Sequence, residues 1–214
     1  VPTTLSVLAK NPPTTENITS LRPYFATGST AMAPAVQDRV AEVTGAQVLQ
    51  SYGMTESTSH CTLDPRDGEV RRRCSGIRVP YVKVRIVKMG EGATILRDCE
   101  VDEIGMVLVG GPGVAGGYLD ASQDKGAFLA NGFFVSGDLG SMDAQGYLRI
   151  SGRQKDLIIR GGSNIYPREI EEVLLRHPAV AEVSVIGAES ADLGEEPVAF
   201  VVLKKGMTLT AEEL

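Results

Sequence analysis

The sequence contains no tryptophan, only two histidines and only three cysteines among its 214 residues. Cys61, Cys74 and Cys99 show no CxxC spacing, and an odd, sparse set of this kind is typical of reduced, core-filling thiols in a cytosolic protein. His60 and His177 have no triad pattern near them, so neither is predicted to act as a base.

Long apolar runs and an excess of positive charge are absent as well. No run approaches the roughly 20 apolar residues of a membrane span, and no leader pattern is present, so we expect a cytoplasmic protein without a transmembrane segment. The net charge of −6 does not favour a nucleic-acid partner. The chain begins at Val1 without methionine and ends at Leu214 inside a predicted helix over 209–214, so we expect it to be part of a longer protein.

The first part of the chain alternates predicted strands and helices. An apolar segment over 21–26 precedes a helix over 34–44, whose valines recur at i, i+4 and i+7, and a short buried strand follows over 47–50. This order predicts a parallel α/β layer.

The hydrophobic period then changes. Residues 82–87 alternate apolar and charged side chains, and further strands are predicted over 106–109 and 147–150, which favours a small antiparallel sheet or barrel. A short capped helix is expected over 120–129.

A compact α+β unit is predicted after Gly152. Its expected elements are a hairpin, a helix opened by Pro167 and two strands over 180–186 and 198–203 that are joined by a polar loop. Together with the preceding layer and sheet, the predicted class is α/β plus α+β.

A glycine pattern over 111–116, GPGVAG, matches GxGxxG after an apolar strand. A dinucleotide-binding fold would need a helix to open at once, whereas residues 117–120 continue as a loop. We therefore do not expect Rossmann-type binding here.

Residues 152–171, GRQKDLIIRGGSNIYPREIE, resemble the linker signature of the adenylate-forming enzymes, a superfamily that includes acyl-CoA synthetases and peptide-synthetase adenylation domains. The NIYP segment over 164–167 is similar to the acyl-CoA ligase version. The resemblance covers nearly the whole chain. It implies the later part of the family's large domain over 1–152, with a parallel α/β layer and a barrel-like antiparallel sheet, followed by most of the small, mobile C-terminal domain over 153–214.

A second stretch, YGMTE over 52–56, follows the predicted buried strand. A solvated turn is one interpretation, but the carboxyl end of a parallel strand is also where α/β sheets bind ligands, and a carboxylate suits Mg²⁺. The stretch is similar to a family motif, which implies adenine stacking for Tyr52, phosphate contact for Thr55 and Mg²⁺ binding for Glu56. Thr55 and Glu56 are thus the expected catalytic residues, with Gln50 and Gly53 as nucleotide-binding neighbours.

The segment 27–30, TGST, lies ahead of the predicted helix, where backbone amides favour an electronegative partner. An ordinary N-cap is the alternative. The segment resembles the family loop between adenine and the acyl pocket, which makes Gly28 and Ser29 candidate cofactor-binding residues, although Ala31 stands where the family usually has proline.

Asp138 follows Ser136 and Gly137 in a segment similar to the family's Thr-Gly-Asp, which implies that its carboxylate accepts hydrogen bonds from both ribose hydroxyls; a turn aspartate is the alternative. Arg153 is either a ribose or α-phosphate partner or a solvated arginine. We expect Tyr52 to Glu56, Asp138 and Arg153 to converge on one nucleotide.

Lys155 occupies the family's hinge position. Gly161 and Gly162 are predicted to turn a hairpin, and the resemblance implies that they also line the pantetheine tunnel of coenzyme A.

The resemblance implies an ATP-dependent, AMP-forming acid–CoA ligase that uses Mg²⁺, ATP, coenzyme A and a small-molecule carboxylic acid. It also implies a phosphate loop with a lysine before Val1 and a catalytic lysine after Leu214, so we expect these 214 residues alone to be inactive. Two alternatives stay open, namely an acyl-AMP ligase that loads a carrier protein and a nucleotide-binding module without turnover.

Overall fold

The computed structural model describes residues 2–11, 24–28, 32 and 34–214. The chain forms two compact units, the first comprising Val1–Ser136 with Gly140–Ile150, the second Gly137–Leu139 with Ser151–Leu214. The main division after Ile150 lies close to residue 152. The identification of the units with parts of a large and a small domain stays a prediction.

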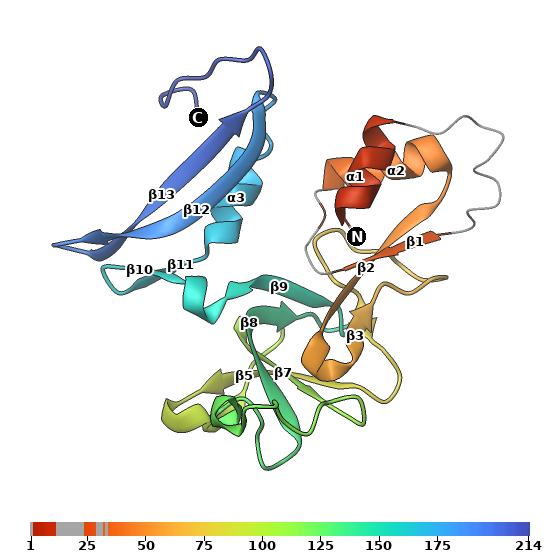
Figure 1. Ribbon diagram of the computed structural model, residues 1–214, viewed down its shortest axis with the longest axis vertical. Coiled ribbons are helices and arrows are strands. Elements are labelled where there is room, and N and C mark those ends of the chain that lie inside the picture. The colour runs from red at the N-terminus through yellow and green to blue at the C-terminus, as the bar shows by residue number, and fades with distance from the viewer. Residues whose placement is uncertain (1, 12–23, 29–31, 33) are drawn as a thin grey trace. The chain divides into compact units, whose positions relative to one another are not determined.

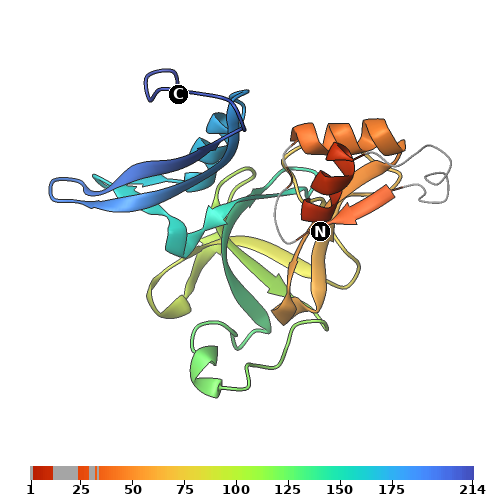
Figure 2. The same cartoon turned by 45° about the horizontal axis from the view of Figure 1, so that its top comes forward.

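A small α/β layer with a mixed sheet opens the first unit. Its elements are α1 (Pro2–Lys10), β1 (Tyr24–Thr27), α2 (Pro34–Thr44), β2 (Gln47–Met54), β3 (Ser59–Leu63) and β4 (Ile77–Arg78), and the sheet order is β1-β2-β3-β4. Strands β1 and β2 are parallel, and α1 and α2 lie together beside them (Figures 1 and 2). The predicted parallel α/β layer is confirmed for β1 and β2, whereas β3 and β4 add antiparallel strands to the same sheet.

The packing of this layer follows from the valine pattern of α2. Val40 is fully buried and joins Leu5 of α1, Met32 and Val48 of β2 in one core cluster. Burying the apolar stripe of α2 against a sheet strand and a second helix is what an amphipathic helix of this length needs for stability.

Strand β2 is longer than predicted. It continues to Met54 rather than ending at Gln50, because residues beyond Gln50 pair antiparallel with β3. The register shifts between Tyr52 and Gly53, which places a β-bulge inside the YGMTE stretch. Residues up to Met54 therefore belong to a bulged strand, and the interpretation of this stretch as a solvated turn does not hold for Tyr52 to Met54.

A five-stranded sheet forms most of the rest of the first unit. Its strands are β5 (Lys83–Met89), β6 (Ile95–Asp98), β7 (Gly105–Gly110), β8 (Phe133–Met142) and β9 (Leu148–Arg153), in the order β6-β5-β7-β8-β9. Residues 137–139 of its strand β8 and residues 151–153 of its strand β9 belong to the second unit. Among the described residues β6 and β9 are the two edges of this sheet, so of the predicted antiparallel sheet or barrel the structure forms the open sheet and no barrel. The helix expected over 120–129 is a 3-10 turn, Ala121–Asp124, which Asp120 caps by accepting the N–H of Ser122 at 3.0 Å.

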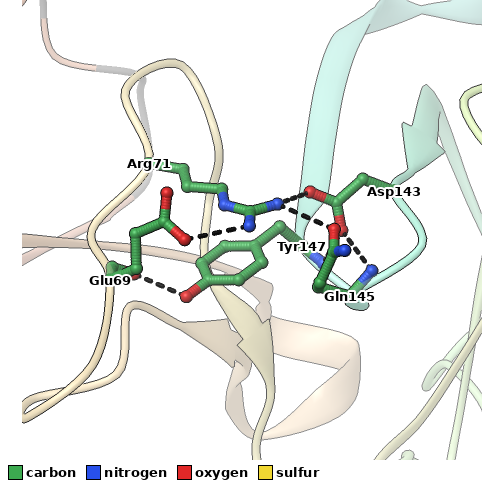
Figure 3. A network of polar contacts seen from close by, with 5 residues as sticks. All are labelled: Glu69, Arg71, Asp143, Gln145 and Tyr147. Carbon is green, nitrogen blue, oxygen red and sulfur yellow. Dashed lines mark hydrogen bonds and ion pairs between the residues drawn. The ribbon is translucent and has the colours of Figure 1, made fainter.

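A polar network holds the 64–76 segment against the turn between β8 and β9 (Figure 3). The Arg71 guanidinium donates to Asp143, to Gln145 Oε1 at 3.2 Å and to Glu69 Oε2 at 2.9 Å. It also lies 4.4 Å from the ring centroid of Tyr147, whose phenol donates to the Glu69 carbonyl at 2.5 Å. Each member has a partner, so the network reads as a structural clamp.

The second unit is a four-stranded sheet with one helix on it. Its elements are β10 (Ile158–Arg160), β11 (Ser163–Ile165), α3 (Pro167–Leu174), β12 (Val180–Ser190) and β13 (Gly194–Leu203), in the sheet order β11-β10-β13-β12. Helix α3 covers one face of β12 (Figure 1), where Glu171 Oε1 accepts the N–H of Val185 at 2.9 Å. The predicted α+β order is confirmed, but most of the expected polar loop belongs to the two long strands.

The helix predicted over 209–214 is absent from the described structure, and only a turn forms. Glu213 Oε2 accepts the N–H of Thr210 at 2.9 Å, so the capping interaction exists without a helix after it. So few residues cannot offset the cost of helix nucleation without packing against a partner. No described helix is both long and apolar enough to cross a membrane.

Candidate functional site

The carboxyl ends of β1 and β2 bring two of the predicted motifs together. Thr27 pairs with Gln50, and Ser51 Oγ donates to the Thr27 carbonyl at 3.0 Å. A Cβ added to Gly28 would lie 2.5 Å from Ser51 Oγ, so only glycine fits this approach without movement. Gly28 and the YGMTE stretch therefore share one edge of the parallel layer, where α/β sheets bind ligands. Ser29 lies outside the described residues.

The bulge in β2 needs Gly53 for the same reason. A Cβ at this position would lie 1.6 Å from the carbonyl oxygen of Ser59 on β3, closer than any real contact. The neighbouring Tyr52 is half-buried and packs partly against the core cluster around Cys61. Gly53 thus permits close backbone approach, while the predicted adenine stacking of Tyr52 stays a prediction.

Both the backbone N–H and the backbone carbonyl of Gln50 form hydrogen bonds with the buried Asp64. Its N–H donates to Asp64 Oδ2 at 2.8 Å, and the N–H of Asp64 donates back to the Gln50 carbonyl at 2.8 Å. The Gln50 side chain is buried and accepts the Met32 N–H at 3.4 Å. Because Asp64 is desolvated, its carboxyl pKa rises to about 6, opposed by the hydrogen bond from Gln50.

Thr55 and Glu56 follow on a short 3-10 helix, Thr55–Ser57. Thr55 is exposed and Glu56 is half-buried. Glu56 Oε1 accepts the phenolic O–H of Tyr118 at 2.7 Å, and this hydrogen bond, with burial second, raises the pKa of Tyr118 to about 12. Within the described part of the chain, Oε2 of Glu56 has no hydrogen-bond or ion-pair partner.

The sequence prediction missed Tyr118. The signal was present, because Tyr118 directly follows the paired Gly116 and Gly117 at the end of the glycine-rich segment. That segment was considered only as a dinucleotide motif. In the structure no α-helix opens after it within residues 111–120.

The Glu56 carboxylate suits a magnesium ion that is also bound by phosphates, rather than a metal site made of protein ligands alone. The described residues contain no cluster of three or more histidine, cysteine or carboxylate ligands. Mg²⁺ commonly takes one or two protein carboxylates and completes its shell with waters and substrate phosphates. Glu56, whose Oε2 accepts no hydrogen bond from the described residues, has the ligand chemistry for this arrangement.

Asp138 and Arg153, predicted separately, are paired in the second unit. Arg153 Nε lies 3.3 Å from Asp138 Oδ1; the aspartate side chain is 14% exposed and the arginine 62%. Arg153 is therefore engaged with a carboxylate, not merely solvated. Lys155 is exposed on a 3-10 helix, Gln154–Asp156, and helps line an open cavity of about 510 Å³ within this unit.

Gly161 and Gly162 form the two-residue turn between β10 and β11. Their φ values, +55° and +84°, are both positive, as a tight hairpin turn of the primed type requires. The hairpin prediction is confirmed; the lining of a pantetheine tunnel stays a prediction.

A parallel layer that ends in Gly28 and the YGMTE stretch, followed by an antiparallel sheet and a small α+β unit, defines the class of adenylate-forming enzymes. Residues 1–119 match the family model described as "AMP-binding enzyme", and residues 169–214 match "AMP-binding enzyme C-terminal domain". The chain belongs to the AMP-binding enzyme family.

Curated relatives are CoA ligases. The chain is 40% identical over 214 residues to marinolic acid–CoA ligase of Pseudoalteromonas sp. (strain SANK 73390), covering 100% of this chain and 33% of that protein. It is 38% identical over 187 residues to 2-succinylbenzoate–CoA ligase of Bacillus subtilis (strain 168), covering 87% of this chain and 37% of that protein. The chain therefore spans about a third of the length of these relatives.

Solved structures show the same similarity in three dimensions. ATP-bound MatB from Rhodopseudomonas palustris matches with a TM-score of 0.88 and 37% identity, over 98% of this chain and 41% of that chain. The O-succinylbenzoate CoA synthetase MenE from Bacillus subtilis, in complex with AMP, matches with a TM-score of 0.83 and 34% identity, over 99% of this chain and 41% of that chain.

Proposed function

We propose that the protein is an ATP-dependent, AMP-forming acid–CoA ligase and that these 214 residues are its later large-domain segment and most of its small domain. The observation that carries the proposal is 40% identity to a CoA ligase along the whole chain. The shared edge of Gly28 and residues 52–56 supports it, because this geometry suits a nucleotide phosphate chain.

The proposed reaction has two steps. A substrate carboxylate oxygen attacks the α-phosphorus of ATP. The bond between the α-phosphorus and the oxygen that bridges to the β-phosphorus breaks, and pyrophosphate leaves with the electron pair of that bond. The product is an acyl-adenylate. The thiolate of coenzyme A then attacks the acyl carbon, and AMP departs as a phosphate monoester. The protein contributes positioning and charge stabilisation to both steps.

The residues take the following proposed roles. The Thr55 hydroxyl donates to a phosphate oxygen, and the Tyr52 ring contacts adenine. The Asp138 carboxylate accepts hydrogen bonds from the ribose hydroxyls. Arg153 orients that carboxylate and donates a hydrogen bond to the nucleotide. Glu56 would hold Mg²⁺, which, when bound, neutralises charge on the phosphates.

In the second unit, Lys155 is the proposed hinge, and Gly161 and Gly162 are the proposed lining for the thin pantetheine arm of coenzyme A. The hinge role rests on the exposed position of Lys155 in a short 3-10 helix. We also propose that the chain by itself does not form thioesters, since it spans about a third of the relatives' length.

The test is acid-dependent ATP–pyrophosphate exchange by the full gene product with a panel of aromatic, dicarboxylic and aliphatic acids. Glu56→Ala should lower the exchange rate about 10²- to 10³-fold, the usual cost of one preorganised charge contact. Glu91→Ala, at an exposed acid of the same unit, is the matched control. Exchange at the wild-type rate in Glu56→Ala would remove Glu56 from the site.

AMP release with and without coenzyme A then identifies the acceptor. Release that depends on coenzyme A supports the ligase proposed here. Exchange without such dependence would instead indicate an enzyme that loads a carrier protein, and absence of exchange with every acid would indicate a nucleotide-binding module.

A further inference from the structure

The glycine-rich segment 111–118 has no role in the proposed function, yet its contacts converge on the turn that carries Glu56. The N–H of Ala115 donates to the Glu56 carbonyl at 2.8 Å. Two residues after Glu56, Thr58 Oγ1 donates to the Gly113 carbonyl at 2.6 Å. The segment therefore braces the backbone at and just beyond Glu56.

Tyr118, at the end of this segment, is itself fixed. Its N–H donates to Asp124 Oδ1 at 2.7 Å. Its ring meets Phe128 edge to face, with centroids 5.4 Å apart, and Phe128 lies 4.9 Å from Phe134. A phenol held by its own backbone and by an aromatic chain loses little further freedom when it donates to a fixed acceptor.

That acceptor is Glu56 Oε1, 2.7 Å from the Tyr118 oxygen. With Oε1 occupied, the carboxylate presents its other oxygen, Oε2, for which the described residues supply no hydrogen bond. A flexible glutamate thereby becomes a ligand with one oriented oxygen.

We propose that Tyr118 is a positioning residue for Glu56, whose hydrogen bond to Oε1 orients Oε2 toward the divalent cation of the nucleotide. The cation's presence rests on the proposed function, whereas the oriented carboxylate rests on the geometry alone. The residue has no direct contact with the reacting atoms in this assignment. Removing the hydroxyl should weaken cation binding and leave the chemical step intact at saturating metal.

The experiment uses Tyr118→Phe in the full gene product, which retains the ring contact with Phe128 and removes only the hydroxyl. Tyr81→Phe is the matched control, since Tyr81 is 84% exposed. Binding of Mn²⁺ in the presence of a non-hydrolysable ATP analogue is measured by electron paramagnetic resonance. The expected result is about 10-fold weaker binding in Tyr118→Phe, the loss of one hydrogen bond to a charged group, and no change in Tyr81→Phe.

Kinetics separate positioning from general structural support. In ATP–pyrophosphate exchange, Tyr118→Phe should raise the Mg²⁺ concentration for half-maximal rate about 10-fold, with the rate at saturating Mg²⁺ within about 2-fold of wild type. In a Glu56→Ala background, Tyr118→Phe should change Mn²⁺ binding no further, because its partner is gone.

Unchanged Mn²⁺ binding in Tyr118→Phe overturns the inference, and so does an equal loss of binding with and without the Glu56 carboxylate. A lower rate at saturating Mg²⁺ with an unchanged half-maximal concentration also overturns it. If the wild-type protein shows no exchange with any acid, the proposed function fails, and Mn²⁺ binding still decides the inference separately.

Discussion

The backbone N–H of Gln50 and the carboxylate of Asp64 form a buried hydrogen bond of 2.8 Å, just before β2 bends at its bulge. Asp64 is 2% exposed, and its second oxygen, Oδ1, is buried without a hydrogen-bond partner among the described residues. A carboxyl group in such surroundings loses its proton only at a cost in free energy. The strand end that carries the candidate site is therefore linked to the ionisation of one internal acid.

This linkage predicts a specific pH dependence of stability. The folded pKa of Asp64 is raised from 3.8 to about 6, so between these values the folded protein retains a proton that the unfolded chain releases. The free energy of unfolding therefore falls as pH rises through this window and levels off above it. Asp64→Asn should remove this fall and add roughly 2 to 3 kcal/mol at pH 7.5, but nothing at pH 3.5.

Urea unfolding at a series of pH values measures the effect. Asp67→Asn is the control, because the Asp67 side chain is 89% exposed in the same segment. Equal stability of wild type and Asp64→Asn at pH 7.5 would show that Asp64 ionises in the fold without cost.

Gly53 should be irreplaceable for packing reasons. The Cβ of an alanine at this position would lie 1.6 Å from the carbonyl oxygen of Ser59, so β2 and β3 would have to move apart at the bulge. We expect a loss on the order of 3 kcal/mol in Gly53→Ala, seen as a lower thermal midpoint. Gly116→Ala is the control, since a Cβ there meets no atom within 4 Å. A wild-type midpoint for Gly53→Ala would contradict the observed strand register.

The Arg71 clamp predicts a small effect that can be isolated at Tyr147. Tyr147→Phe removes the hydrogen bond to the Glu69 carbonyl and retains the ring under the Arg71 guanidinium. The free energy of unfolding should fall by about 1 kcal/mol, the net value of one such bond. Chemical denaturation measures this change against Tyr81→Phe, and equal losses in both variants would argue against the clamp.

Asp138→Asn tests the proposed ribose contact. The substitution keeps the size of the side chain but removes the charge that pairs with Arg153. We expect ATP affinity to fall about 10- to 100-fold, since hydrogen bonds to a charged acceptor are strong. Isothermal titration with ATP measures it, with Asp192→Asn at an exposed site of the same unit as control. Unaltered ATP affinity would contradict the proposed contact between Asp138 and the ribose.

Local sequence patterns predicted the elements that depend on neighbouring residues. The valine spacing in 34–44 identified α2 because Val40 is buried, and Val36 partly buried, in the core cluster that also holds Val48 of β2. Gly161 and Gly162 identified a hairpin because few other residues adopt two positive φ values in succession. The family resemblance is confirmed by the matches over 1–119 and 169–214.

Features that depend on distant partners were missed. The extension of β2 to Met54 comes from pairing with β3, and whether a five-stranded sheet closes depends on edges that no local pattern encodes. The bond between Tyr118 and Glu56 joins residues 62 positions apart. Asp138 and Arg153 were predicted individually, but their direct pairing was not.

The edge formed by Gly28 and Gly53 is bare main chain pressed against neighbouring main chain and one serine hydroxyl. Saturation mutagenesis aimed at new acid specificity will therefore find no productive diversity at these two codons. Libraries should hold both glycines constant, together with the proposed catalytic residues Thr55 and Glu56.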